Sequence, residues 1–223
     1  MKTDINFERY VKLVLHKMNR VDKIRITSDA LLQINTVLNL YSTKIIEISE
    51  GICKMNNRKT ISSGAIKSSM FILQPNSSYL RTSADKTLKK FLSNKGNGGD
   101  KATLANITLA PSRVEKLMRK QSSLKISENA VIYFSGVLDK FITELIDLAR
   151  NHTLNRDAKT INTSDIYNTF YDDEEFNAFA KMINFAIAGG GVERNVSYKI
   201  LKKAEAKREA KEEREKEAKA KKK

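Results

Sequence analysis

The sequence predicts an all-helical protein built from two copies of one helical unit. The chain has 223 residues, with only two prolines and nine glycines and no tryptophan, and it lacks long stretches of Val, Ile and Thr alternation. Its apolar residues recur at alternating steps of three and four, as on one stripe of a helix, and this pattern returns 100 positions later. The length suits one large domain or two domains of about 100 residues each.

The repeat is clearest in two long amphipathic segments, which open at residues 26–30 (ITSDA) and 126–130 (ISENA). The first stripe consists of Leu31, Ile34, Leu38, Tyr41, Ile45, Ile48, Ile52 and Met55, and the second of Val131, Phe134, Leu138, Phe141, Leu145 and Leu148. The agreement continues past the helix end, where Lys-Thr-Ile stands at both 59–61 and 159–161. Internal duplication of one fold is therefore expected.

Each copy follows the plan short helix, basic loop, long helix, polar loop, short helix. Thr27 and Ser127 suit the N-caps of the long helices, because a hydroxyl accepts a backbone N–H that the first turn leaves free. Each long helix is expected to run for about 27 residues, or roughly 40 Å. The short helices are expected at 6–18, 62–73, 112–121 and 163–170, and the loops at 20–25, 56–60, 122–125 and 155–160.

The lengths of these helices predict how the copies associate. Two helices of about 11 residues, roughly 16 Å each, leave part of a stripe of roughly 40 Å uncovered. Exposed apolar surface costs about 25 cal/mol per Å². A second copy crossing the first would cover it, so we expect an intramolecular pair whose association does not depend on concentration.

Further segments lie outside the repeat. Pro75 is expected to open another helix carrying Leu80, Ala84, Leu88 and Phe91, and residues 93–100 form a flexible linker. Residues 172–175 start a small helix with Phe176, Phe179 and Ile183, which the glycines of 188–192 end. Residues 202–223 contain eleven basic and six acidic residues. They form either a solvated single helix or a disordered tail.

The net charge of +15 indicates a polyanionic partner, with nucleic acid first and an anionic membrane surface second. No apolar run approaches the roughly 20 residues that span a bilayer. The Lys-rich tail lacks the apolar face that membrane-surface binding needs, so no membrane partner is expected. Cys53 is the single cysteine, which excludes an intramolecular disulfide and favours a reducing compartment.

Short, long and short helices separated by basic loops resemble the histone fold. The first copy resembles the two-B core histone at residues 58–63 and at Gln74-Pro75 with the helix that follows. The second resembles the two-A histone at residues 113–120, 172–177 and 190–192. The resemblance covers nearly all of residues 6–203, and fusion in this order is similar to the histone doublets of large amoeba-infecting DNA viruses, especially the Marseillevirus group.

This resemblance implies two histone folds in tandem that form an intramolecular handshake pseudo-dimer. It divides the chain into a two-B-like fold with an extra C-terminal helix (1–93), a Gly/Asn-rich linker (94–103), a two-A-like fold with a docking segment (104–203) and a charged tail (204–223). The implied protein is a structural packager of double-stranded DNA rather than an enzyme. Its implied partners are a doublet of the three/four histone types and a second copy of itself in an octamer-like particle. The implied location is the virion and the viral factory.

A runner-up function is a histone-fold subunit of a transcription factor, which would prefer particular DNA sites. The packaging interpretation predicts sequence-independent, salt-sensitive phosphate contacts. Its candidate DNA-binding residues are basic or hydroxyl-bearing residues of the loops and of the second copy's first helix: Lys23, Arg25, Thr27, Arg58, Lys59, Thr60, Arg113, Lys116, Arg119, Lys125, Lys159 and Thr160. The resemblance singles out Arg113, Arg119 and Lys125.

The resemblance also implies an acidic patch that receives arginines of other proteins, although a solvated helical face is the alternative. Ser77 stands where a glutamate is usual in the family, which alters the charge of this patch. Its candidate residues are Asp85, Asp139, Glu144, Asp147, Asp173, Glu174 and Glu175.

No catalytic or cofactor constellation emerges. His16 and His152 lack zinc-ligand spacing, and Cys53 lies beside the apolar stripe as a small filler. Residues 172–175 lack the alternating ligands and central glycine of a calcium loop. No Lys-Ser/Thr follows the glycines at 189–191, as a phosphate loop requires. We therefore expect no metal and no cofactor.

Overall fold

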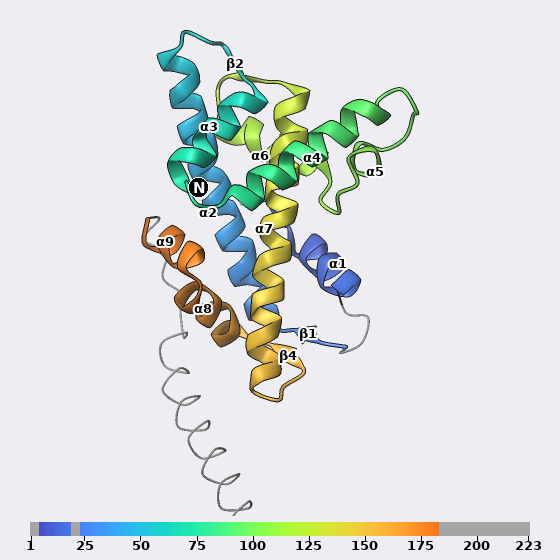
Figure 1. The fold of residues 1–223 in the computed structure, drawn as a ribbon, viewed down its shortest axis with the longest axis vertical. Helices are drawn as coiled ribbons and strands as arrows, with labels where there is room; N and C mark the ends of the chain where they lie inside the picture. Colours follow the sequence, from blue (N-terminus) through green and yellow to red (C-terminus); the bar gives the residue numbers. More distant parts are fainter. Residues whose placement is uncertain (1–4, 19–22, 183–223) are drawn as a thin grey trace, which may run out of the picture.

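The structure is a computed structural model that describes residues 5–18 and 23–182 (Figure 1). Two units of short, long and short helix are present, as the repeat predicts. Copy one comprises α1 (Glu8–Met18), α2 (Ser28–Met55) and α3 (Ser63–Leu73). Copy two comprises α6 (Pro111–Gln121), α7 (Glu128–Asn155) and α8 (Thr163–Asp172).

Both long helices begin where the capping residues predict. The Thr27 hydroxyl accepts a hydrogen bond from the backbone N–H of Ala30, and the Ser127 hydroxyl accepts one from Ala130. Each bond satisfies an N–H that has no partner inside the first turn. The capping prediction is confirmed, and each long helix contains 28 residues.

The long helices cross and share one hydrophobic core. Where they cross, the rings of Tyr41 on α2 and Phe141 on α7 stack with centroids 4.3 Å apart. Phe179 meets the Tyr41 ring edge-on at 5.0 Å. The Tyr41 hydroxyl donates to Gln74 Oε1 at 2.8 Å, and burial raises its pKa well above the usual value, so it stays a neutral donor. The apolar stripes therefore share one core over most of their length, as expected, but Met55 at the end of the first stripe is 87% exposed because the helix outruns the core there.

Short parallel β pairs join the loops of one copy to those of the other. Strand β1 (Arg25–Ile26) pairs with β4 (Thr160–Ile161), and β2 (Thr60–Ile61) pairs with β3 (Lys125–Ile126). Since each pair contains one strand from each copy, the described part of the molecule has the handshake arrangement. The prediction of two tandem histone folds is confirmed.

The helix after copy one begins later than predicted. We expected Pro75 to open it, but α4 spans Ser78–Asn94 and Pro75 lies in the preceding turn. The guanidinium of Arg81 donates to the carbonyls of Gln74 and Pro75, both at 2.8 Å. These bonds hold the turn in place, so the helix starts only after it. Leu80, Ala84 and Phe91 are buried and Leu88 is partly buried, as their spacing predicts.

The flexible stretch expected at residues 93–100 is followed by a short helix that the sequence analysis did not predict. Helix α5 (Lys101–Ala105) is capped by Asp100, whose carboxylate accepts from the backbone N–H of Ala102. Ala105 joins Phe91 and Ile132 in a small second hydrophobic cluster. Gly98 and Gly99 have φ of +67° and +115°, which side chains disfavour, so glycine suits this turn.

Copy two ends in one further described helix. Helix α9 (Glu174–Met182) starts after Asp173, whose carboxylate accepts from the N–H groups of Glu175 and Phe176. Phe176 and Phe179 are buried against the core, so the predicted small helix is confirmed. Ile183, the glycine-rich segment 188–192 and the charged tail lie outside the described residues.

Candidate nucleic-acid interface

One end of the molecule gathers candidate residues from both copies at the β1–β4 pair (lower end in Figure 1). Arg25 lies opposite Thr160, and the Arg25 N–H donates to the carbonyl of Lys159 at 2.9 Å. The side chains of Lys23, Arg25 and Lys159 are exposed. The Thr27 hydroxyl, two residues after Arg25, accepts the capping bond through its oxygen, and among the described residues its hydrogen has no acceptor, so it can donate to a ligand.

The opposite end has the same construction at the β2–β3 pair. Lys125 lies opposite Thr60, and the Lys125 N–H donates to the carbonyl of Lys59 at 3.1 Å. Arg58, Lys59 and Lys125 are all exposed. Two 28-residue helices separate the two ends by about 40 Å at 1.5 Å per residue. The arrangement therefore presents two similar groups of cations at the two ends of the crossed helices.

Helix α6 carries the remaining DNA-binding candidates. Val114, Leu117 and Met118 are buried, which leaves Arg113, Lys116 and Arg119 on the exposed face. Arg119 donates from Nε and Nη2 to Glu115 Oε1, at 3.0 and 2.7 Å. Part of its charge is therefore neutralised within the helix.

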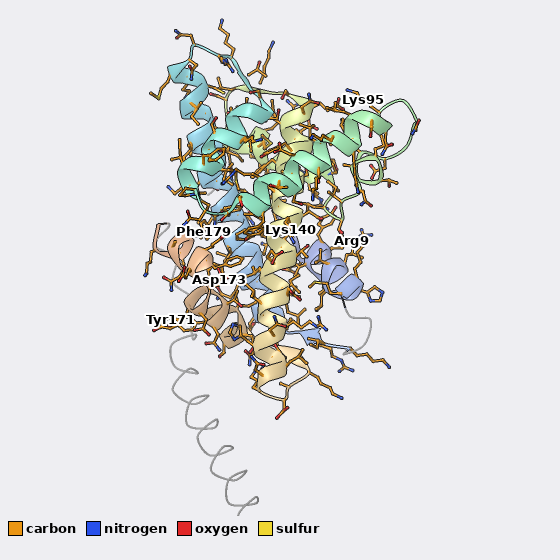
Figure 2. All side chains as sticks on the ribbon, in the orientation of Figure 1. Arg9, Lys95, Lys140, Tyr171, Asp173 and Phe179 are labelled. Carbon is orange, nitrogen blue, oxygen red and sulfur yellow. The ribbon has the colours of Figure 1, made fainter. Side chains whose placement is uncertain are left out.

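Sequence reasoning missed the cations of α1, the counterpart of α6 in copy one. Val11, Val14 and Leu15 are buried, so Arg9 and Lys12 lie on the exposed face. Figure 2 places Arg9 on the opposite side of the molecule from Asp173 and Tyr171. The amphipathic pattern of residues 6–18, read together with that of α6, was the available signal.

The β4 strand is braced by a buried ionic network that the sequence analysis also missed. Asp165 has no solvent exposure and accepts from Arg156 Nε at 2.8 Å and Nη2 at 2.7 Å, and from the hydroxyl of Thr153 at 2.9 Å. Arg156 Nη2 also donates to the carbonyl of Thr160 at 2.8 Å. Arg156 thus positions Thr160 at the β1–β4 end.

Copy one lacks this brace. The positions 100 residues earlier hold Cys53, Asn56 and Ala65, so the hydroxyl, the cation and the carboxylate are all absent there. Cys53 is buried, as its expected role of small filler requires, and its thiol lies 3.5 Å from the carbonyl of Thr60. The two ends therefore share strand pairing but differ in what supports it.

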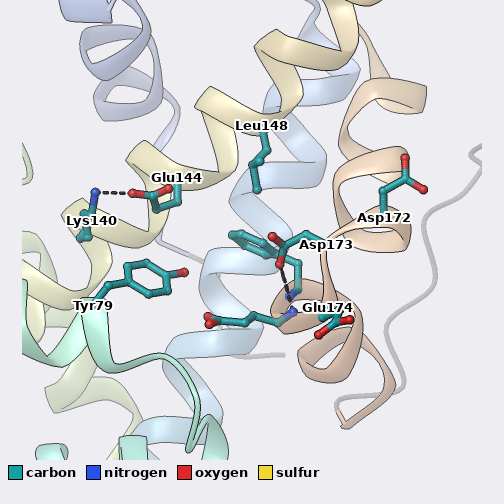
Figure 3. A pocket seen from close by; sticks show the side chains of 9 residues that line it. Tyr79, Lys140, Glu144, Leu148, Asp172, Asp173 and Glu174 are labelled. Carbon is teal, nitrogen blue, oxygen red and sulfur yellow. Dashed lines mark hydrogen bonds and ion pairs between the residues drawn. The ribbon is translucent and has the colours of Figure 1, made fainter.

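An acidic cavity of about 580 Å³ lies where copy two meets α4 (Figure 3). Its lining residues are Tyr79, Lys140, Glu144, Leu148, Asp172, Asp173, Glu174, Glu175 and Phe176. Lys140 forms an ion pair with Glu144, and the Ser77 hydroxyl donates to Glu175 Oε2 at 2.6 Å. Burial, followed by the negative charge of Glu175, raises the pKa of Tyr79, so this phenol stays neutral.

The cavity holds four of the acidic-patch candidates: Glu144, Asp173, Glu174 and Glu175. Asp147 does not line it and lies 3.8 Å from Arg150. Asp85 pairs with Lys67 at 2.7 Å. Sequence reasoning did not include Asp172 or Lys140, which do line it.

Asp139 lies apart from the cavity and holds the chain that leads into α6. Its carboxylate accepts from the N–H groups of Thr108 and Leu109, both at 2.9 Å. Burial raises the pKa of Asp139, although these two hydrogen bonds oppose the shift. The contacts of Asp139 are therefore structural.

Within residues 5–18 and 23–182, no three His, Cys, Asp or Glu side chains are grouped so that they could hold a metal ion. His16 is exposed, and His152 is partly buried with Nε2 4.0 Å from Asp172 Oδ2. None of the described helices is long and apolar enough to cross a membrane.

Comparisons with known proteins agree with this architecture. Residues 107–168 match the family model of histone-like transcription factors (CBF/NF-Y) and archaeal histones. A two-A histone of Meyerozyma guilliermondii is 28% identical over 119 residues, which are 51% of this chain and 90% of that protein. A two-A histone of Eremothecium gossypii is 30% identical over 104 residues, which are 46% of this chain and 78% of that protein.

The crystal structure of the histone from Methanopyrus kandleri superposes with a TM-score of 0.52 at 12% identity, covering 76% of this chain and 96% of that one. This likeness supports the fold, which places the chain in the class of histone-fold proteins. The sequence relatives go further: the chain belongs to the histone family.

Proposed function

We propose that the chain is a structural DNA-packaging protein in which a two-B-like and a two-A-like histone fold are fused. The observation that carries this proposal is the pairing of loops from opposite copies, which puts exposed cations beside a threonine at both ends of the crossed helices. Lys and Arg neutralise phosphates, and the N-termini of α2 and α7 add partial positive charge close to each pair. The proposed role is binding rather than catalysis.

The proposed contacts are independent of DNA sequence. The strands at both ends are two residues long, and the cations there stand on these strands and the adjoining loops rather than on a helix positioned to enter a groove. Backbone contacts of this kind position a protein on DNA without reading bases. Affinity should then depend on salt and DNA length, and hardly on base order.

We further propose a partner doublet of the three/four histone types. The outer face of α3 is exposed and apolar, with Phe71 at 52% and Ile72 at 61% exposure. The Arg81 guanidinium lies over the Phe71 ring, 4.0 Å from its centroid, and the exposed apolar surface that remains suits packing against another helical pair. With a second copy of this chain, the complex would form an octamer-like particle in the virion and viral factory. The proposed domains are 1–93, 94–103, 104–203 and 204–223.

The acidic cavity is proposed as a docking site for basic segments of other proteins. Five carboxylates face one lysine, Lys140, so the cavity carries a surplus of negative charge. Glu144 contacts Lys140, Glu175 contacts Ser77 and Asp172 lies 4.0 Å from His152. Glu174 has no such side-chain partner among the described residues, so it is the carboxylate most available to a basic segment.

A transcription-factor subunit is the second candidate function, favoured by the family model that residues 107–168 match. The two functions differ in DNA preference. Competition between unrelated duplexes of equal length separates them, because a packaging protein would bind them equally and a sequence-reading factor would not.

The direct test is reconstitution of the full chain with DNA and a three/four-type doublet, followed by micrococcal nuclease digestion. A protected fragment of defined length supports packaging, and a continuous smear contradicts it. A variant with Arg25→Gln, Lys59→Gln, Lys125→Gln and Lys159→Gln should bind weakly and flatten the salt dependence by about 0.9 per lost contact. Lys44→Gln with Lys54→Gln is the control, since both lysines are exposed on α2 and already paired with glutamates.

A further inference from the structure

Helix α4 carries a row of lysines that the loop-based interface does not use. Lys86, Lys89 and Lys90 are exposed, and none has an ion-pair partner within the described parts of the chain. Lys89 and Lys90 follow Lys86 by three and four residues, about one helical turn. All three therefore lie on one side of the helix, within about 6 Å along its axis. We refer to these three residues as the α4 lysine row.

The row stands on a rigid support. Leu80, Ala84 and Phe91 bury the opposite side of α4. The helix also approaches α7 closely, since a Cβ added to Gly136 would lie 2.9 Å from Thr87. A rigid support lowers the entropy that the row would lose on binding a ligand.

No acidic side chain within the described chain offsets the charge of this row. The single acidic residue of α4, Asp85, is paired with Lys67 on α3 at 2.7 Å. The neighbouring lysines behave differently, because Lys95 and Lys101 both pair with Glu128, at 2.5 and 2.7 Å. The charge of the row is thus open to an external anion, whereas that of the linker lysines is used internally.

The row also lies apart from the paired loops. Helix α4 crosses in front of α7 in Figure 1, whereas the β1–β4 and β2–β3 pairs lie at the two ends of the long helices. A duplex held by those ends leaves the outer side of α4 available. A duplex carries one charge per about 1.7 Å of its axis when both strands are counted, so about 6 Å of it holds three or four phosphates, a charge comparable to that of the row.

We propose that the α4 lysine row binds the phosphates of a second DNA duplex, so that one molecule links two segments of DNA. The inference rests on the proposed function, in which the first duplex lies on the paired loops. Linking through α4 would let packaged DNA condense beyond a single particle without any added bridging protein.

The test uses the full chain bound to a duplex immobilised on beads and measures capture of a second, fluorescent duplex. The variant is K86Q/K89Q/K90Q. The matched control, K44Q/K54Q/K181Q, removes the same charge from exposed lysines elsewhere. Thermal melting checks that both variants are folded.

Wild type should capture the second duplex with a slope of log affinity against log salt of about −2.7, because each of three contacts contributes about −0.9. The α4 variant should bind the immobilised duplex as wild type does and lose most of the capture, while the control keeps it. Equal capture by wild type and the α4 variant would overturn the inference, as would an equal loss in the control. Failure of wild type to bind the immobilised duplex would overturn the proposed function and the inference together.

Discussion

At the scale of single residues, the close packing of α4 on α7 requires a glycine at position 136. Gly136 lies in the middle of α7, facing Thr87, and a Cβ there would approach Thr87 Cβ, Oγ1 and Cγ2 to 2.9–3.0 Å. Real Cβ atoms do not come so close, so one of the two helices would have to move. Gly51 on α2 is the natural contrast, because a Cβ there would meet nothing within 4 Å.

Gly136→Ala is therefore expected to lower the free energy of unfolding by about 1–3 kcal/mol, the usual cost of overpacking a close contact. Gly51→Ala should instead stabilise by about 0.5–1 kcal/mol, since alanine favours a helix interior over glycine. Urea denaturation of both variants measures the difference. If Gly136→Ala proved as stable as Gly51→Ala, the close approach of α4 to α7 would be wrong.

A second residue-scale prediction concerns the network around Asp165. Asp165→Ala leaves Arg156 and Thr153 without their buried acceptor and should cost about 3 kcal/mol, as removal of one partner from a buried ion pair does. The triple change Thr153→Cys, Arg156→Asn and Asp165→Ala reproduces the residues of copy one. It should be more stable than Asp165→Ala alone, because no uncompensated charge remains.

Hydrogen exchange of the β4 amides, together with thermal unfolding, checks this prediction. The strands β2 and β3 provide the internal control, since their end of the molecule lacks the network and its exchange should not change. A triple variant less stable than Asp165→Ala would contradict the idea that copy one is a self-consistent apolar version of the same site.

At the scale of elements, ion pairs with the carboxylate of Glu128 connect the linker to the start of α7. The ion pairs of Glu128 with Lys101 and Lys95 hold its pKa below the usual range. An acid with a lowered folded-state pKa contributes stability above its unfolded pKa, and this contribution is lost as pH falls through the folded value. The ion pairs of Glu128 should therefore stabilise the fold at neutral pH and lose this contribution in the acid range.

Glu128→Gln should consequently melt below wild type at pH 7, by roughly 1–3 °C for exposed pairs of this kind. The gap should begin to narrow at about pH 4.3, the usual value for a glutamate, and should close only below the lowered folded-state pKa of Glu128, where the wild-type carboxylate is also neutral. Thermal melting of both proteins across this pH range is the measurement. Glu47→Gln is the comparison, because Glu47 pairs with Lys44 within α2 and lies outside the linker. A gap that stayed constant with pH would show that the charge of Glu128 is not what holds the linker.

At the scale of the whole molecule, the two copies form one core rather than two. Tyr41, Phe141 and Phe179 pack together across the boundary between the copies, and both pairs of strands join one copy to the other. Covalent fusion keeps the partner close, but the contact surfaces themselves should be enough to hold the copies together.

Cutting the chain between Gly98 and Gly99, with a protease site inserted there, should leave the halves associated. They should elute together from a sizing column and unfold in one transition, whose midpoint now rises with protein concentration because association is no longer intramolecular. The uncut protein with the same insertion is the control. Halves that separated as folded monomers would contradict the shared core.

Much of this architecture follows from local patterns in the sequence. Steps of three and four in the apolar residues place the long helices, and Thr27 and Ser127 mark where they begin, because helix periodicity and capping depend only on near neighbours. The repeat and the uncovered stripe also predict that the copies cross. The sequence therefore determined the helices, their duplication, the pairing of the copies and the basic character of the loops.

Only the tertiary structure decided how residues distant in sequence meet. The pairing of Arg25 with Thr160, the position of Asp139 beneath Thr108 and Leu109, and the folding of α5 onto Phe91 and Ile132 all depend on contacts between separate elements. The proposed roles of Lys140 in the acidic cavity and of the α4 lysine row likewise depend on which side chains other helices place beside them. Charge and burial are properties of a three-dimensional environment, so a pattern along the chain shows which residues are available and the fold decides what each of them contacts.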